Sequence, residues 1–252
     1  MKIVYSKTAD ELGKKAANHT AELLRRYIET EGSARLLLST GASQFATLNA
    51  LIEEPVDWNK VEMFHLDEYL GITQDHPASF VRYLQERFTS KVQLKKAHFV
   101  DTSGDINKLI AKLTEEINKK PIHVGCIGIG ENSHIAFNDP PADFDNENAF
   151  IIVTLAESCR KQQLGEGWFP AIQDVPEQAV TITAKQILKC KHIISAVPYK
   201  VKAQAIYDTL KSPGITPMVP STILRNHEDV TIYIDEDSSS MIDVSEFMSS
   251  SK

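Results

Sequence analysis

Residues 122–141 read IHVGCIGIGENSHIAFNDPP, and this stretch predicts both the type of fold and the place of its chemistry. Its first part, Ile122 to Ile127, is short, apolar and followed by glycines. That pattern is typical of a buried parallel strand whose carboxyl end opens into a functional loop. The loop then carries an amide (Asn132), an imidazole (His134) and a carboxylate (Asp139). Loop histidines are more often structural, so a catalytic interpretation needs support from other segments.

Apolar runs alternate with helical patterns along most of the chain. The expected strands are Ile3–Tyr5, Ala34–Leu38, Val61–Leu66, Ile122–Ile127, Phe150–Thr154, Ile193–Val197 and Val230–Ile234. Apolar residues three and four apart predict helices at Ala9–Tyr27, Ser43–Ile52, Phe80–Phe88, Ile106–Ile117 and Lys200–Leu210. This alternation predicts an α/β fold with a mostly parallel, doubly wound sheet and helices on both faces. Because parallel strands end at one edge, we expect the loops after Leu38, Leu66, Ile127 and Val197 to converge there.

Length and composition indicate one soluble domain. The 252 residues are expected to form a single α/β domain, 1–252, with a Ser-rich surface tail from about residue 238 that includes Ser238–Ser240 and Ser249–Ser251. A net charge of -7 without a basic cluster argues against binding to nucleic acid or anionic membranes. Three widely spaced cysteines predict neither a disulfide framework nor a thiolate zinc site. No secretory or membrane-spanning pattern is present, so we expect a cytoplasmic protein.

The strand Ala34–Leu38 leads into the loop Ser39-Thr40-Gly41-Ala42-Ser43-Gln44, which precedes a helical pattern. Small residues let backbone N–H groups approach an anion. A helix amino terminus and the hydroxyls of Thr40 and Ser43 add donors, so the loop is a candidate phosphate site. In isolation, Ser43 is more simply an N-cap. The loop lacks the lysine of a nucleotide P-loop, and Ser133 stands where a dinucleotide-binding motif has its third glycine, which disfavours ATP and NAD.

Two adjacent carboxylates, Asp67 and Glu68, follow the strand Val61–Leu66. Neighbouring side chains on an extended chain face opposite ways, so one carboxylate can enter the crevice while the other faces solvent or a structural partner. In a partly dry pocket, Asp67 could remove a carbon-bound proton, a role worth about 10²–10⁴ in rate. The structural alternative is a turn or helix-capping acid.

The loop after Ile127 combines groups suited to proton transfer. A carboxylate that holds one imidazole nitrogen sets the tautomer and raises the basicity of the other nitrogen, so His134 with Asp139 is a candidate proton shuttle. Asn132 can orient the ring but cannot stabilise an imidazolium. A metal bound by His134, Asp139 and Asp67 is conceivable, but no two of these residues have the spacing of metal ligands on a helix.

Two cations follow later strands: Arg160, after Phe150–Thr154, and Lys202, after Ile193–Val197. A guanidinium fork and an ammonium point charge together suit a phosphate monoester. Most surface Arg and Lys side chains do no such thing, and nothing local distinguishes Lys202 from Lys200.

Taken together, these segments resemble the glucosamine-6-phosphate deaminase (isomerase) family, which shares a superfamily and a modified Rossmann-like fold with the 6-phosphogluconolactonases. The similarity extends from Ile3 to about Asp235, and the run from His134 to Asn138 favours deaminases over lactonases. The motifs that carry it are Phe64-His65-Leu66-Asp67-Glu68-Tyr69, His76-Pro77-Ala78-Ser79, Gly128-Ile129-Gly130, His134-Ile135-Ala136-Phe137-Asn138, Val153-Thr154-Leu155 with Arg160, Lys202-Ala203, and Pro220-Ser221-Thr222-Ile223-Leu224 with His227.

The resemblance implies a reaction on a hexosamine 6-phosphate without metal or organic cofactor. The pyranose opens, a proton leaves C2 and returns at C1, and the imine is hydrolysed to fructose 6-phosphate and ammonia. The resemblance makes Asp67 the C2 base and His134, supported by Asp139, the ring-opening shuttle. It assigns the phosphate to Gly41, Ala42, Ser43, Arg160 and Lys202, and further substrate contacts to Thr40, Glu68, Ala136 and Phe137. The segment from about Glu157 to Phe169 resembles a mobile lid.

Three positions depart from the family pattern: Asn132 replaces the usual aspartate, Asp139 replaces glutamate, and Gln44 replaces a common proline. An Asp-to-Asn change beside a catalytic histidine can cost orders of magnitude in rate, unless Asp139 takes over. A branch with asparagine here includes galactosamine-6-phosphate isomerases. We expect glucosamine 6-phosphate as the substrate, with galactosamine-6-phosphate isomerisation, 6-phosphogluconolactonase-like hydrolysis and non-catalytic sugar-phosphate sensing as alternatives. Family members occur as monomers and as hexamers, so a homo-oligomer is compatible with the sequence.

Overall fold

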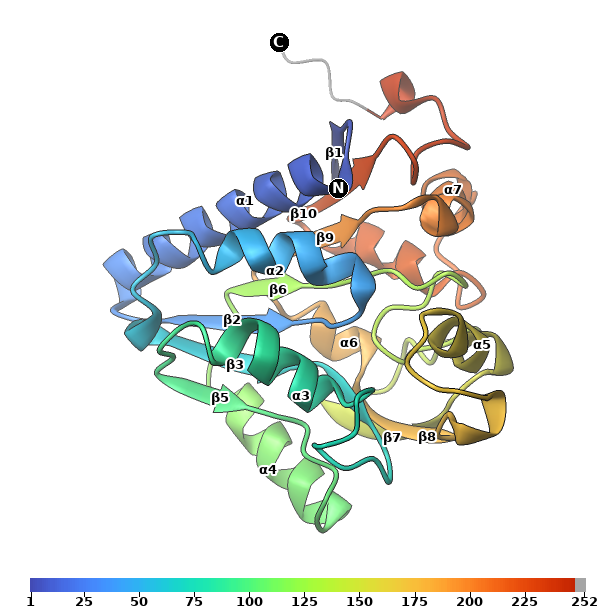
Figure 1. The fold of residues 1–252 in the computed structure, drawn as a ribbon. Helices are drawn as coiled ribbons and strands as arrows, with labels where there is room; N and C mark the ends of the chain where they lie inside the picture. The colour runs from blue at the N-terminus through green and yellow to red at the C-terminus, as the bar shows by residue number, and fades with distance from the viewer. Residues whose placement is uncertain (248–252) are drawn as a thin grey trace.

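The computed structural model describes residues 1–247, and its centre is a seven-stranded sheet of order β1-β10-β9-β6-β2-β3-β5 (Figure 1). These strands are β1 (Lys2–Ser6), β2 (Ala34–Leu38), β3 (Val61–His65), β5 (Lys96–His98), β6 (Val124–Cys126), β9 (His192–Val197) and β10 (Val230–Asp235). Every neighbouring pair in it is parallel. A smaller antiparallel sheet of order β4-β8-β7 comprises β4 (Asp67–Tyr69), β7 (Phe150–Thr154) and β8 (Gln178–Ile182).

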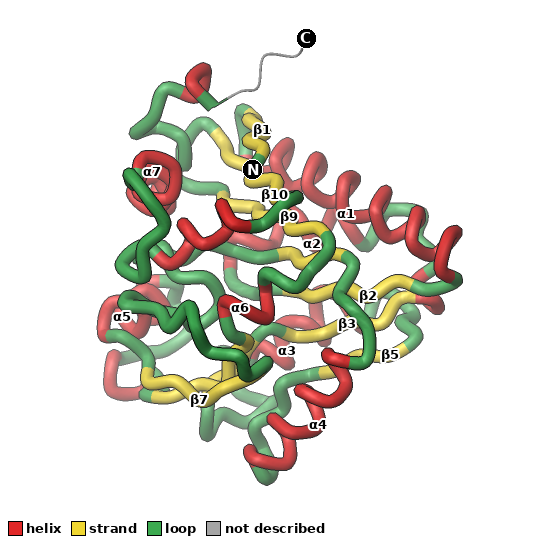
Figure 2. Tube along the Cα trace, turned by 180° about the vertical axis from the view of Figure 1, so that it is seen from behind, coloured by secondary structure: helices red, strands yellow, loops and turns green. Residues whose placement is uncertain are grey.

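Helices cover both faces of the large sheet, as the sequence predicts. One face carries α1 (Ala9–Glu31), α2 (Phe45–Leu51) and α3 (Phe80–Leu84), and the other carries α4 (Ile106–Asn118), α6 (Ala184–Ile187) and α7 (Ala203–Lys211), seen from behind in Figure 2. Strand β2 explains the two layers, because Leu36 and Leu38 pack with α1 whereas Leu37 packs with α4 and α7. Helix α5 (Glu157–Gly165) lies beyond the small sheet, where Cys159 joins an aromatic cluster.

Several predicted elements differ from those observed. Phe150–Thr154 is a strand, but it belongs to the antiparallel sheet. The predicted helix Phe80–Phe88 divides into α3 and a π-helical turn, Gln85–Thr89. The helices predicted from Ser43 and Lys200 begin as 3₁₀ turns, Ala42–Gln44 and Lys200–Lys202. Strands β4, β5 and β8 and helices α5 and α6 were not predicted. Strands β4 and β5 are only three residues long and carry charged side chains, so they leave little periodicity to detect.

The Ser-rich segment is partly buried, contrary to the predicted surface tail. Ser238 is 0% exposed, its hydroxyl accepts from the Asp235 N–H at 3.0 Å, and its own N–H donates to Asp235 Oδ1 at 2.8 Å. Ser239 is also buried and donates to the Asp235 carbonyl at 2.7 Å. These serines close the turn after β10. Ser240 is exposed, and Ser249–Ser251 lie outside the described residues.

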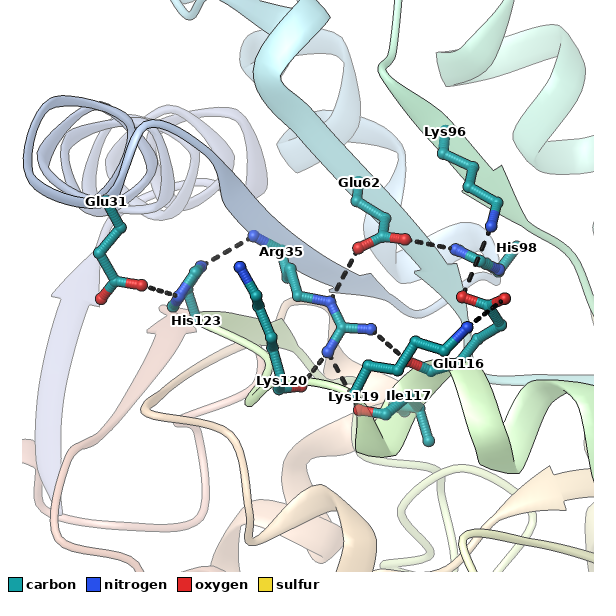
Figure 3. A network of polar contacts seen from close by, with 10 residues as sticks. All are labelled: Glu31, Arg35, Glu62, Lys96, His98, Glu116, Ile117, Lys119, Lys120 and His123. Carbon is teal, nitrogen blue, oxygen red and sulfur yellow. Dashed lines mark hydrogen bonds and ion pairs between the residues drawn. The ribbon is translucent and has the colours of Figure 1, made fainter.

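A partly buried ion network holds the amino-terminal ends of β2 and β3 to α4 (Figure 3). Arg35 Nε donates to Glu62 Oε2 at 2.9 Å, and His98 Nε2 lies 2.7 Å from the other oxygen of Glu62. The same guanidinium donates to the carbonyls of Glu116, Ile117 and Lys120 at the end of α4. Because these helix-end carbonyls would otherwise lack donors, Arg35 joins α4 to the sheet. The carboxyl ends of these strands, on the opposite side, continue into the loops described below.

Among the helices within residues 1–247, none has both the length and the apolar character that crossing a bilayer requires.

Candidate active site

A cavity opens at the carboxyl ends of β2, β3 and β6. It lies where the strand order reverses, since the chain proceeds from β2 to β3 and β5 on one side and from β6 to β9 and β10 on the other. The empty space that it encloses is about 520 Å³, a volume that includes open solvent at its mouth. The predicted convergence of loops is confirmed: the lining residues are Ser39, Thr40, Gly41, Ser43, Leu66, Asp67, Phe80, Gly128, Ile129, Gly130, His134, Ala136, Phe137, Gln162, Gln163, Glu166 and Lys202.

Asp67 lies where the chain passes from one sheet to the other. It directly follows Leu66, which links β3 to β4, and it pairs with Thr181 of β8. Its side chain lines the cavity although the residue is only 6% exposed. Burial, aided by the charge of Glu68, raises the pKa of Asp67 to about 8. The carboxyl group can therefore gain and lose a proton near neutral pH, as a general acid and base must.

Glu68 faces away from the cavity, as the alternation along an extended chain requires. Its carboxylate accepts hydrogen bonds from the Tyr69 N–H at 3.0 Å, the Ser79 hydroxyl at 2.8 Å and the Val81 N–H at 2.9 Å. Glu68 therefore anchors the start of α3, so the helix-capping alternative considered for Asp67 describes its neighbour instead. The structure does not support the substrate contact predicted for Glu68.

His134 is 8% exposed, and its imidazole packs directly against the backbone of Gly130. A Cβ added at Gly130 would lie 2.2 Å from the ring, so the site requires glycine there. The flanking residues Ser133 and Ala136 have φ values of 67° and 47°, an uncommon backbone state for residues other than glycine that is frequent at functional sites. His134 Nδ1 lies 3.1 Å from Asp139 Oδ1 but makes no well-aligned hydrogen bond within residues 1–247.

The structure brings Asn132 and Asp139 together beside His134. Asn132 Nδ2 donates to Asp139 Oδ1 at 2.9 Å and to the Ser158 hydroxyl at 3.1 Å, while Asn132 Oδ1 accepts from the His134 N–H. The Ala156 N–H donates to Asp139 Oδ2 at 2.9 Å. Burial alone would raise the pKa of Asp139, but the contact with His134 and these donors outweigh it and hold that pKa below its usual value. The group facing the imidazole is thus a carboxylate, and Asn132 holds that carboxylate rather than the ring.

The predicted phosphate loop contributes Thr40, Gly41 and Ser43 to the cavity, and Ala42 lines an adjoining groove. Gly41 has a φ of 96° and ψ of 164°, a conformation nearly restricted to glycine. The N-cap interpretation of Ser43 is wrong, because Ser43 lies inside a 3₁₀ turn and α2 has no side-chain cap. Gln44, which replaces the family's proline, donates to Ser43 Oγ at 3.0 Å and to the Ala196 carbonyl at 3.1 Å. It links this loop to β9.

The two predicted phosphate-binding cations have different positions. Lys202 lines the cavity and is 4% exposed, and burial lowers its pKa. Its ammonium has no hydrogen bond to any residue within 1–247 and is free to bind an anion. Arg160 is not among the cavity-lining residues. Its guanidinium donates to the carbonyls of Ile172 and Val175 at 2.9 and 3.0 Å, so the structure does not bring Arg160 to Lys202.

Sequence reasoning did not identify three lining residues from α5 and its carboxyl end: Gln162, Gln163 and Glu166. They fall within the segment predicted to be a lid. Glu166 Oε2 lies 3.9 Å from the position of a Cβ on Gly41, and its carboxylate accepts from Gln162 Nε2 at 2.9 Å and Trp168 Nε1 at 3.1 Å. A carboxylate therefore stands beside the candidate phosphate loop. The predicted substrate contacts Thr40, Ala136 and Phe137 all line the cavity.

A protein-family model described as glucosamine-6-phosphate isomerases/6-phosphogluconolactonase matches residues 7–233. The chain belongs to this family. A glucosamine-6-phosphate deaminase of Thermoanaerobacter sp. (strain X514) is 34% identical over 250 residues, covering 96% of this chain and 95% of that protein. A glucosamine-6-phosphate deaminase of Lactobacillus delbrueckii subsp. bulgaricus (strain ATCC BAA-365 / Lb-18) is 29% identical, covering 96% of this chain and 100% of its own.

Solved structures within the glucosamine-6-phosphate isomerase/6-phosphogluconolactonase family share the fold. A monomeric glucosamine-6-phosphate deaminase superposes with a TM-score of 0.88 at 29% identity, covering 96% of this chain and 100% of that one. A 6-phosphogluconolactonase from Thermotoga maritima gives a TM-score of 0.75 at 18% identity, covering 93% and 98%. The second likeness establishes the family fold alone. The parallel, doubly wound sheet predicted from the sequence is thus confirmed.

Proposed function

We propose that this protein isomerises and deaminates a hexosamine 6-phosphate, most simply glucosamine 6-phosphate, to fructose 6-phosphate and ammonia. The observation that carries the proposal is a single cavity lined both by a buried carboxyl group, Asp67, and by a buried ammonium, Lys202. A sugar phosphate supplies a partner for each: an anionic tail for Lys202 and an acidic carbon-bound proton for Asp67. The identity to deaminases across nearly the whole chain supports the same reaction.

The phosphate would bind to the loop after β2 and to Lys202. Gly41 allows the backbone to approach an anion without a side chain in the way, and the Ser43 hydroxyl adds a donor at the same cavity wall. Lys202 supplies the opposite charge in a partly dry environment, where an ion pair is stronger than in water.

Ring opening would use His134 with Asp139. The carboxylate 3.1 Å from Nδ1 favours the tautomer with the proton on that nitrogen, which leaves Nε2 to accept the proton of the O1 hydroxyl and to deliver it to the ring oxygen O5. Asp139 also stabilises the imidazolium formed between these two steps. Asp139 then supplies the charge that Asn132 lacks.

Isomerisation would use Asp67 as both base and acid. The ionised carboxylate takes the C2 proton of the open-chain aldehyde, and the enolamine that forms regains a proton at C1 from the neutral acid. The C2 imine then adds water and expels ammonia, so one substrate and one water give fructose 6-phosphate and ammonia. A pKa near 8 keeps both protonation states of Asp67 accessible during this cycle.

The proposal is tested by measuring ammonia released from glucosamine 6-phosphate and from galactosamine 6-phosphate, with 6-phosphogluconolactone hydrolysis as a parallel assay. We expect ammonia from glucosamine 6-phosphate and no lactone hydrolysis. Faster ammonia release from galactosamine 6-phosphate would show that this epimer is the preferred substrate, as in the branch of the family that has asparagine at position 132. If both sugar phosphates bind in calorimetry but neither is turned over, the protein is a non-catalytic sugar-phosphate sensor and the proposed enzymatic function is wrong.

A further inference from the structure

A cluster of metal-ligand side chains lies beside the cavity, and the proposed reaction does not use all of it. One imidazole nitrogen of His134, one carboxylate oxygen of Asp139 and Sγ of Cys159 lie within 4.8 Å of one another. We propose that these three side chains bind Zn²⁺ and that this binding reversibly inhibits the enzyme. The site differs from the metal site weighed on sequence grounds, because Cys159 replaces Asp67.

The ligand types and their spacing suit zinc. Zn²⁺ binds imidazole nitrogen, carboxylate oxygen and thiolate sulfur at about 2.0–2.3 Å in a tetrahedron, which places ligand atoms roughly 3.3–3.8 Å apart. His134 Nδ1 and Asp139 Oδ1 are already 3.1 Å apart. Cys159 Sγ, within 4.8 Å of both atoms, would supply the third corner of the tetrahedron. The fourth corner would be taken by water, as in zinc sites that have three protein ligands.

A second, independent observation points to a ligand at this place. His134 is 8% exposed, and its Nδ1, although 3.1 Å from Asp139 Oδ1, makes no well-aligned hydrogen bond among the described residues. Buried polar atoms are rarely left without a partner, and those that are commonly mark an ion, a water or a functional group. The carboxylate of Asp139 is meanwhile held by Asn132 Nδ2 and the Ala156 N–H. Such outer partners are what orient a ligating carboxylate in known metal sites.

A second close group, Glu62, His98 and Glu116, shows the contrast (Figure 3). Both of its carboxylates already have cationic partners: Arg35 lies 2.9 Å from Glu62, and Lys119 lies 2.9 Å from Glu116. A metal ion would have to displace these side chains. The cluster at Cys159 contains no lysine or arginine, so a dication there would displace no cationic side chain.

Zinc binding would block the proposed proton shuttle. Cys159 belongs to α5, whereas His134 and Asp139 belong to the loop after β6, so the ion would tie these two segments together. The thiol proton leaves to solvent when the thiolate binds, and the metal occupies the imidazole and carboxylate needed for ring opening. The wide spacing of the cysteines argues against a zinc site built from several neighbouring cysteines. It does not argue against this site, because its single cysteine and its other two ligands come from two segments that the fold brings together.

The test uses the full chain, freed of metal with a chelator and titrated with ZnCl₂ by calorimetry. We expect one Zn²⁺ per chain in the wild type. Cys159→Ser should weaken binding by at least about 100-fold, because even loss of an outer partner commonly costs about 10- to 100-fold. Cys190→Ser, at a buried cysteine of the main core, is the matched control and should bind as the wild type does. Equal zinc affinity in the wild type and Cys159→Ser would overturn the proposal.

A measurement on the wild type alone covers the case in which Cys159→Ser does not fold. Co²⁺ is added in place of Zn²⁺, and a near-ultraviolet thiolate-to-cobalt absorption band is expected, whereas bound Co²⁺ without that band would overturn the assignment. Where ammonia release is observed, Zn²⁺ should suppress it and a chelator should restore it. Only the inhibition by Zn²⁺ rests on the proposed function, and the binding of Zn²⁺ does not. Since calorimetry and absorption need no turnover, failure of the zinc site and failure of the deaminase assignment give different results.

Discussion

Replacing Asp67 with asparagine should abolish turnover and stabilise the fold at neutral pH. Burial raises the pKa of Asp67 from 3.8 in the unfolded chain to about 8, so the folded state keeps a proton that the unfolded state releases. The free energy of unfolding therefore falls as pH rises through this window, by about 1.4 kcal/mol per pH unit. Asparagine carries no charge and escapes this loss. The stability gain of Asp67→Asn should grow by about 3 kcal/mol between pH 5 and pH 7.5.

Urea unfolding followed by tryptophan fluorescence at the two pH values measures this difference directly. Burial also raises the pKa of Glu68, to about 7, but Glu68 titrates in both the wild type and the variant. Most of the pH dependence of the difference in unfolding free energy between the two proteins therefore belongs to Asp67. Asp75→Asn, at an exposed position, is the control and should show no such trend. A gain that is absent, or that is the same at pH 5 and pH 7.5, would refute the argument that Asp67 is held in a desolvated site.

Three further outcomes are expected. The value of kcat/KM should rise about tenfold per pH unit up to about pH 8 as Asp67 ionises, and a flat profile from pH 6 to 9 would exclude it as the base. Gly130→Ala should lower kcat by roughly 10²-fold by displacing the imidazole, whereas Gly104→Ala, whose Cβ meets no atom within 4 Å, should not. Glu166→Gln should tighten inorganic phosphate binding about fivefold in calorimetry by removing a like charge beside Gly41, and an effect equal to that of exposed Glu177→Gln would contradict this.

Six of the seven strands of the large sheet could be predicted, because these are mainly apolar and five of them are five or six residues long, whereas β5 is short and charged. The small sheet could not be predicted as a unit. Strand β4 consists of Asp67, Glu68 and Tyr69, whose polarity suggests a loop, and its strand character comes from pairing with β8 far along the chain. Burial of Ser238 likewise depends on the turn it forms with Asp235, which apolar periodicity does not reveal.

The candidate site could be predicted where it depends on residue types that stand out in the local sequence. Glycines before His134 and paired acids after a strand mark the cavity from the sequence alone. Which cation reaches the cavity was not predictable, because Arg160 and Lys202 carry equivalent local signals and only the fold shows that carbonyl groups hold the guanidinium. The place of Glu166 beside Gly41 also depends on packing between α5 and a loop more than a hundred residues earlier.

We propose that Asp67 removes the C2 proton of a hexosamine phosphate in this cavity, and isotope transfer can follow that proton. Glucosamine 6-phosphate carrying deuterium at C2 is incubated with the wild type and with Asp67→Asn. The wild type is expected to release ammonia while the deuterium appears at C1 of fructose 6-phosphate or in the solvent, and the variant is expected to leave the label at C2. Label loss and ammonia release by Asp67→Asn at the wild-type rate would contradict it.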